Sequence, residues 1–272
     1  MKRFRYHYEN SVTFSSPVKA HTWLQRCLPR YEQFQRPETT HFCAEAGEEN
    51  FAPIPFQERL DGLGNPLRYG HVQDRHTAFR IVSDGIVRQT PYRICDSSHG
   101  MFLAATALTA PGPEMLEAVR SLPRPHENFG AVFTHLSSTL NTALAAASAV
   151  HDTMTYAPGT TDVATPAAVA FARKNGVCQD YAHIVIGMVR CLGIPARYVC
   201  GFLPGEGATH AWVEVFDNGV WRGLDPTHNR LIDYGCIKVA HGRDSDDCPV
   251  NRGIFTGLAK QQQHIVIKVE AS

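Results

Sequence analysis

The chain has 272 residues, of which 43% are hydrophobic and 19% charged, a composition typical of a globular protein with material for a substantial core. Its 26 Lys and Arg balance its 26 Asp and Glu, which argues against nucleic acid or an anionic membrane as a partner. No stretch approaches the ~20 apolar residues of a membrane span, and the N-terminus lacks the apolar segment of a signal peptide, so we expect a cytoplasmic protein.

Residues 1–105 are predicted to form a β-rich region. Turn-forming stretches at 15–17 (SSP), 62–66 (GLGNP) and 83–85 (SDG) separate short runs of strand-forming residues. Many short strands divided in this way are typical of a β-sandwich or a small barrel. The expected strands are 3–14, 20–29, 39–44, 67–72, 77–83 and 85–91.

Residues 106–272 have a different character and are predicted to form a second unit. Helices are expected over 110–123 and 127–151, and a third begins with Thr165 as N-cap and Pro166 at its first position. Strands are expected at 196–203, 210–216 and 220–226, with a last strand at 264–270. The sequence thus predicts an α+β protein with a β-rich N-terminal domain.

The eight cysteines stand at irregular spacing, with no CxxC pair and no zinc-finger spacing. In a reducing cytosol we expect most of them to be free thiols that pack as small hydrophobic groups. Cys178 differs, because it opens a predicted amphipathic helix. Gly193 and Pro195 end that helix, and its buried stripe is formed by Cys178, Ala182, Val185, Val189 and Leu192.

A hairpin downstream of this helix brings two further polar residues together. Asn218-Gly219 is a strong signal for a two-residue turn, which places Phe216 opposite Trp221 and Trp212 opposite Asp225. His210 and Asp225 then share one face of the sheet as diagonal neighbours, roughly 7–8 Å apart at the backbone. A three-residue turn would put them on opposite faces.

Cys178, His210 and Asp225 have the chemistry of a nucleophile, a base and an orienting carboxylate. A helix N-terminus and a neighbouring imidazole both favour the thiolate, and a carboxylate on the second ring nitrogen fixes the tautomer. The Cys178 N–H lies in the first helical turn, where it can donate to an oxyanion. Tyr156 is our candidate for the second oxyanion donor.

These residues lie in motifs that resemble the transglutaminase-like superfamily. The stretches are GVCQDYAHIVIGMVRCLGIPARYVCGF and HAWVEVFDNGVWRGLDPT, which supply the G-x-C, H-A-W and L-D-P-T elements of that family. YHYENSV and DGLGN resemble the N-terminal region of bacterial members. HGRDSDDCPVNRG resembles the segment after their core but departs from it at residues 245–248. The resemblance implies a papain-like fold and a Cys-His-Asp triad at Cys178, His210 and Asp225, as in bacterial candidate cysteine proteases.

We therefore expect acyl transfer from a protein or peptide amide through a Cys178 thioester. Water as acceptor gives a protease or amidase, and an amine gives a transglutaminase. Two other classes stay open: a non-catalytic scaffold or peptide-binding module, and a metal enzyme. No acidic cluster has the spacing of a Ca²⁺ loop, and we expect no metal or other cofactor. The oligomeric state is not predicted.

Several residues near these motifs also have simpler interpretations. Asp180 is expected to be a first-turn carboxylate that the helix dipole stabilises. Cys191 and Cys200 are expected to be packing thiols, and His228 is expected to be solvated. Cys178 and His183 are five residues apart, on different helix faces, which disfavours a zinc pair. Trp212 is expected either to shield the site from water or to cover the core, and 242–247 (GRDSDD) to be a surface loop.

Overall fold

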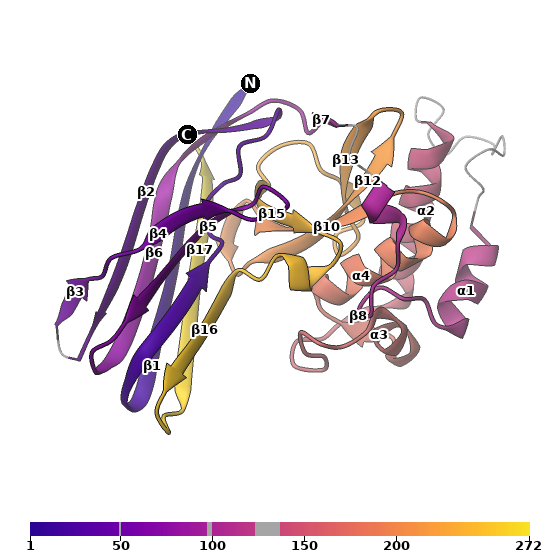
Figure 1. Ribbon diagram of the computed structural model, residues 1–272. Helices are drawn as coiled ribbons and strands as arrows, with labels where there is room; N and C mark the ends of the chain where they lie inside the picture. Colours follow the sequence, from indigo (N-terminus) through magenta and orange to yellow (C-terminus); the bar gives the residue numbers. More distant parts are fainter. Residues whose placement is uncertain (49, 97–99, 123–136) are drawn as a thin grey trace.

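The computed structural model describes residues 1–48, 50–96, 100–122 and 137–272. Two regions lie side by side in Figure 1. Long strands from both ends of the chain form one, and helices packed on a smaller sheet form the other. This mixture of helices and antiparallel sheets confirms the predicted α+β class.

Strand β1 (Lys2–Gln25) organises the first region. Its first half pairs with β6 (His76–Gln89) and β17 (Gln261–Ala271). Its second half pairs with β5 (Pro66–Val72) and β16 (Asn251–Thr256). Within the described residues these strands belong to a nine-stranded sheet, with the path order β11-β17-β1-β6-β2-β3. Its other members are β2 (Gln35–Gly47), β3 (Phe51–Pro53), β4 (Gln57–Leu60) and β11 (Gly205–Gly207).

Two of the three predicted turns in this region are wrong. The chain runs through 15–17 as strand, and its register against β6 shifts between Thr13 and Val18, which marks an irregularity rather than a reversal. It also runs through 83–85, where Gly85 lies in mid-strand because a Cβ there would come within 2.1 Å of the Thr39 carbonyl oxygen. The predicted turn at 62–66 is confirmed, and Asp61 fixes it by accepting hydrogen bonds from the backbone of Leu63 and Asn65.

The last strand of the chain also lies in this sheet. The sequence assigned residues 264–270 to the second unit, whereas β17 pairs with β1 along its whole length. The short strand β11, which precedes His210 by three residues, adds to the free side of β17. The division of the chain at 105/106 stays a prediction, but N-terminal and C-terminal segments share one sheet.

The second region contains an antiparallel sheet. Hairpin β12–β13 lies at its centre, and β10 and β15 continue it on one side. In the part of the chain that is described, its strands are β7 (Ile94–Cys95), β10 (Ala196–Phe202), β12 (His210–Asp217), β13 (Val220–Asp225), β14 (Arg230–Leu231) and β15 (Ile237–Gly242).

Helices cover this sheet on the side away from the long strands (Figure 1). The helix predicted at 110–123 is shorter, and the part of the 127–151 prediction before residue 137 lies outside the described residues. Pro166 is the N-cap of the third helix, which therefore begins at Ala167, one residue later than expected. The elements are α1 (Pro113–Arg120), α2 (Ser138–Thr153), α3 (Ala167–Arg173), α4 (Cys178–Cys191), the 3₁₀ helices Gly100–Leu103 and Ser245–Asp247, and the parallel strands β8 (Thr155–Tyr156) and β9 (Asn175–Gly176).

Helix α4 lies in the middle of this layer, against β10 and β12. Its predicted stripe is buried, since Ala182, Val185 and Val189 are inaccessible to solvent. Full burial of a valine side chain stabilises a fold by ~1.5–3 kcal/mol. The guanidinium of Arg190 donates to four backbone carbonyls, of Phe102, Ala104, Ala196 and Arg243, and so fixes the far end of the helix. The position of Cys178 is therefore set by a rigid element.

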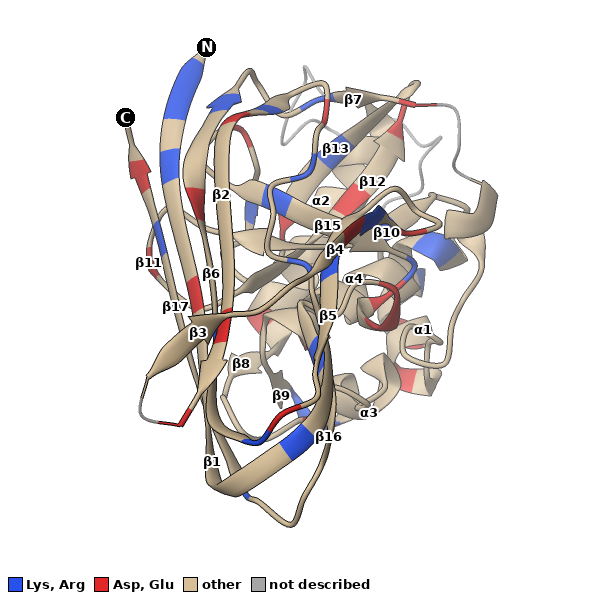
Figure 2. Cartoon of the chain, turned by 60° about the vertical axis from the view of Figure 1, so that its left-hand side comes forward, with Lys and Arg blue, Asp and Glu red and all other residues tan. Residues whose placement is uncertain are grey.

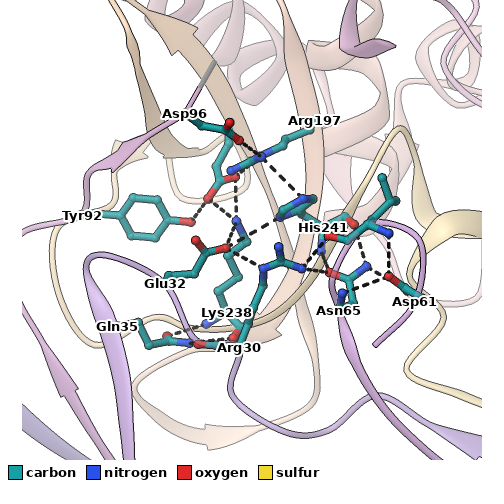
Figure 3. A network of polar contacts seen from close by, with 12 residues as sticks. Arg30, Glu32, Gln35, Asp61, Asn65, Tyr92, Asp96, Arg197, Lys238 and His241 are labelled. Carbon is teal, nitrogen blue, oxygen red and sulfur yellow. Dashed lines mark hydrogen bonds and ion pairs between the residues drawn. The ribbon is translucent and has the colours of Figure 1, made fainter. Parts of the chain in front are cut away.

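A buried network of polar groups joins the two regions (Figure 3). Glu214 on β12 pairs with Arg197 on β10 and with Lys238 on β15, and it accepts a hydrogen bond from Tyr92. Lys238 also lies 3.1 Å from Glu32 of the N-terminal region. Burial opposes the charge on Glu214, but Arg197 and Lys238 outweigh it and lower its pKa to about 2.

Basic and acidic positions are distributed over the two regions, as the colours of Figure 2 show. This agrees with the balanced charge of the chain. None of the helices in the described ranges is both long and apolar enough to cross a membrane. All eight cysteines lie within the described residues and have free thiols, as expected.

Candidate active site

Cys178 is the first residue of α4, at the N-terminus of a largely buried helix. The N3 residue Asp180 accepts hydrogen bonds from the Val177 N–H (2.8 Å) and the Thr161 hydroxyl (2.7 Å). Gly176 of the G-x-C motif is needed here, because a Cβ would lie 2.5 Å from Asp180 Oδ2. Burial raises the pKa of Asp180, against these hydrogen bonds. Asp180 is thus more than a carboxylate stabilised by the helix dipole, because its hydrogen bonds fix the first turn of α4, which holds Cys178.

The hairpin β12–β13 has the predicted register. Asn218 and Gly219 both have positive φ (47° and 83°), as a two-residue turn of this kind requires, and Phe216 pairs with Trp221. His210 opens β12 and Asp225 closes β13, with His210 Nε2 3.1 Å from Asp225 Oδ1. The structure therefore brings these two residues together as the hairpin argument predicts.

His210 also lies beside Cys178, close enough for the thiol to affect the pKa of the imidazole, so His210 stands between the other two residues. Burial alone would lower the pKa of His210. The interactions with Asp225 and Cys178, together with their charges, outweigh it and raise that pKa to about 9. The imidazole is accordingly held in its protonated form at neutral pH, between a thiol and a carboxylate.

Asp225 is inaccessible to solvent, and both of its oxygens are occupied. Oδ1 accepts from the backbone N–H groups of Thr227 (3.1 Å) and His228 (3.3 Å), and Oδ2 lies 2.7 Å from His228 Nδ1 and 3.6 Å from Arg230 Nε. Burial opposes the carboxylate, but the contacts with His210 and His228 keep its pKa below the usual value.

His228 is the functional candidate that the sequence argument missed. It was expected to be solvated, and its side chain is indeed half exposed, but its ring contacts Asp225 and lies 5.2 Å from the His210 ring. The spacing Asp225-x-x-His228, just after the strand, is the signal that could have indicated it. Among the described residues, His210, Asp225 and His228 also form a group whose ligand atoms lie within 4.8 Å of one another, a set that could hold a transition metal.

Tyr156 lies near enough to Cys178 for the charge of the thiolate to act on it. Strand β8 pairs in parallel with β9, which places Tyr156 opposite Gly176. Its side chain is half exposed, and burial together with the nearby Cys178 raises its pKa, so the hydroxyl keeps its proton. The structure places the residue near the thiol, and its role as a donor stays a prediction.

The remaining residues near the site have structural contacts. Trp212 is fully buried and donates from Nε1 to the Tyr92 hydroxyl (3.1 Å), so it covers the core. His183 accepts from the Ser245 N–H at Nε2 and is buried, and its burial lowers its pKa to about 4. The predicted surface loop at 242–247 contains a short 3₁₀ helix, and Asp244, which precedes that helix in the loop, is buried.

The sequence of the chain is similar to known proteins. A model of the transglutaminase-like superfamily matches residues 131–226. An uncharacterised protein of Mycobacterium tuberculosis is 31% identical over 241 residues, which cover 75% of this chain and 73% of that protein. A protein-glutamine gamma-glutamyltransferase of Pseudomonas aeruginosa is 32% identical over 108 residues, 32% of this chain and 16% of that protein. The chain belongs to the transglutaminase-like superfamily.

The fold is also similar to a crystal structure. A candidate cysteine protease from Cytophaga hutchinsonii superposes with a TM-score of 0.76 and 21% identity, and the match covers 99% of this chain and 90% of that one. The similarity therefore includes both regions, the long-stranded sheet as well as the helices and the smaller sheet. At this identity it establishes a shared architecture.

Proposed function

We propose that the protein is a thiol-dependent acyl-transfer enzyme that acts on a protein or peptide amide, with Cys178 as nucleophile, His210 as acid and base, and Asp225 as orienting carboxylate. The observation that carries the proposal is the arrangement at the α4 N-terminus: His210 lies beside Cys178, which raises the pKa of the imidazole, and its Nε2 lies 3.1 Å from Asp225 Oδ1. A free, partly exposed cysteine completes it.

The first half of the reaction forms a thioester. The Cys178 thiolate attacks the carbonyl carbon, and the oxyanion accepts hydrogen bonds from the Cys178 N–H and the Tyr156 hydroxyl. The C–N bond then breaks as the His210 imidazolium gives its proton to the leaving amine. Asp225 stays ionised throughout and keeps the ring in place.

The second half transfers the acyl group to an acceptor. His210, now neutral, removes a proton from water or from a primary amine, which attacks the thioester, and Cys178 leaves as a thiolate. Water gives hydrolysis, and an amine gives transamidation. The residues of the triad serve both outcomes equally, so the acceptor is decided by experiment. Eight free thiols favour a reducing compartment, and we keep the cytoplasm as the proposed location.

The experiment is mass spectrometry of a peptide library incubated with the protein, with and without a primary amine. Shortened peptides indicate a peptidase, and amine adducts that replace ammonia indicate a transamidase. Cys178→Ala is the control, and both products should disappear with it. Full activity of Cys178→Ala would end the proposal.

The second candidate is a peptide-binding scaffold without turnover, and thiol reactivity distinguishes it. Iodoacetamide near pH 6 should modify Cys178 much faster than the exposed thiols of Cys95 and Cys191, because the protonated His210 beside Cys178 favours its thiolate. Slow labelling of all exposed thiols at similar rates would favour the scaffold.

A further inference from the structure

A pocket opens beside the candidate triad, at the junction between the two regions. Its volume is about 360 Å³, within the range of small-ligand sites. Gln179 and Thr209 form part of its wall, and they are the immediate chain neighbours of Cys178 and His210. Cys200, also in the wall, is close enough to Cys178 for their charges to interact. The pocket therefore lies next to the site of the proposed chemistry, since its wall includes chain neighbours of Cys178 and His210.

The inner wall of the pocket is neutral. Tyr198, Cys200 and Cys248 are buried there. Burial raises the pKa of Cys200 to about 12 and the pKa values of Tyr198 and Cys248 well above their usual range, so all three keep their protons at pH 7. A charged side chain in this space would lose its hydration with no opposite charge to replace it.

Charge is confined to the mouth. Of the described residues that line the pocket, only Asp246 and Arg252 are charged, and both side chains are largely exposed. They lie 3.6 Å apart, so each largely compensates the other. Ser245, Asp246 and Cys248 belong to residues 245–248, the stretch where the sequence departs from its family. Residues 245–248 thus form part of the pocket wall.

We propose that this pocket selects the substrate: it holds an uncharged side chain of the residue next to the amide that Cys178 attacks. This inference rests on the proposed function, because only an enzyme has a substrate to select. The preference of the pocket itself can be tested without turnover. Substrates with an acidic or basic side chain at this position should be poor, because the neutral interior offers them nothing in exchange for water.

The test measures alkylation of Cys178 by iodoacetamide and its N-substituted derivatives. The substituents are benzyl and isopentyl, which are apolar, and carboxyethyl and aminoethyl, which are charged. Mass spectrometry gives the rate at Cys178, and the rate at exposed Cys95 in the same sample corrects for intrinsic reactivity. The corrected rates of the apolar probes should exceed those of both charged probes by about tenfold or more.

A variant links this preference to the pocket. Val163 lines the pocket but is 75% exposed, so Val163→Trp obstructs the space without disturbing the core. The ratio of the benzyl rate to the parent iodoacetamide rate should fall at least about fivefold in this variant, since most of the tenfold preference comes from the pocket. Leu258→Trp is the matched control, because Leu258 is fully exposed in the turn between β16 and β17 and does not line the pocket.

The outcomes separate the two proposals. Equal corrected rates for apolar and charged probes, or an apolar preference that survives Val163→Trp, would overturn the pocket inference even if peptides are turned over. A pocket-dependent preference with no product in the peptide assay would instead support the pocket and contradict the proposed enzyme.

Discussion

Two clusters of buried charge lie along strand β12, four residues apart. At its start, His210 connects Cys178 with Asp225. Further along, Glu214 connects Arg197 with Lys238. Each cluster places an ion between two partners on neighbouring elements, and each shifts the pKa of its central residue in favour of the charged form.

The clusters differ in their access to solvent. Arg197, Glu214 and Lys238 are all fully buried, and these charged groups have protein partners. In the first cluster Cys178 is partly exposed, His228 is half exposed, and a pocket opens beside them. A buried charge network is costly to break whether or not it is functional. Accessibility of a nucleophile, not burial of charge, therefore distinguishes a reactive site from a structural one.

The largest expected effect is on catalysis, at the centre of the first cluster. His210→Ala should lower kcat/KM by about 10³–10⁴-fold and slow alkylation of Cys178 near pH 6, because it removes both the base and the cation beside the thiol. Steady-state kinetics and mass spectrometry measure the two quantities. The exposed His264→Ala is the control, and comparable activity in both variants would contradict the assignment of His210.

The next effect concerns the second cluster and is on stability. Glu214→Gln leaves Arg197 and Lys238 buried without their shared counter-charge, so the free energy of unfolding should fall by about 3–5 kcal/mol in urea titrations. Glu45→Gln is the matched control, since Glu45 pairs with the more exposed Arg80 on a neighbouring strand and should cost less than about 1 kcal/mol. A similar small loss in both variants would show that the buried network is dispensable.

The sequence predicted the first cluster well because local rules decide it. The turn preference of Asn218-Gly219 and the alternation of side chains set the relation of His210 to Asp225. The helical spacing of the apolar stripe places Cys178 in the first turn of α4, and Gly193 marks its end. No such rule applies to the second cluster. Arg197, Glu214 and Lys238 come from three strands, and their meeting depends on registers that the sequence does not reveal.

The same reason explains the errors in the long-stranded sheet. SSP at 15–17 has the local preference of a turn, but β1 has partners on both sides, from residues near both ends of the chain, and their hydrogen bonds outweigh that preference. The pairing of β17 with β1 joins residues near opposite ends of the chain, such as Phe4 with Ala271, beyond the reach of any local pattern. His228 was missed because its partner is Asp225, and their contact can be inferred only after Asp225 has been placed at the end of β13.

The pH dependence of the free energy of unfolding should have opposite signs for the two clusters. The first cluster should lose its stabilising contribution at alkaline pH. The pKa of His210 is about 9 in the folded protein against 6.5 ordinarily, so its contribution is complete below about 6.5 and is lost as the pH rises through 9. The difference corresponds to about 3 kcal/mol. Between pH 6.5 and 9.5 the wild type should lose that much more stability than His210→Ala. Parallel curves would contradict the raised pKa.

The second cluster should give an acid limb. Because Arg197 and Lys238 lower the pKa of Glu214, its contribution is present above the unfolded value of about 4.5 and is lost as the pH falls through about 2. Glu214→Gln should therefore lose less stability than the wild type when the pH falls from 5 to 2. Urea titrations at several pH values measure this, and an unchanged acid limb would exclude Glu214 as a source of it.

The smallest expected effect concerns His228, which reaches the first cluster from outside. His228→Ala removes the contact of 2.7 Å with Asp225 Oδ2, so the carboxylate is less firmly oriented toward His210. We expect kcat to fall about tenfold with KM unchanged, since a hydrogen bond to a charged group contributes ~1.5–3 kcal/mol and this one is partly exposed.

His228→Asn separates orientation from mere packing. The Asn amide can place an N–H near the position of Nδ1 and donate to the same carboxylate oxygen, whereas its charge and ring are absent. Recovery of most of the lost kcat in the Asn variant would identify His228 as a positioning residue that acts through Asp225. Equal losses in the Ala and Asn variants would mean that the ring is needed for packing, and wild-type kcat in both would remove His228 from the site.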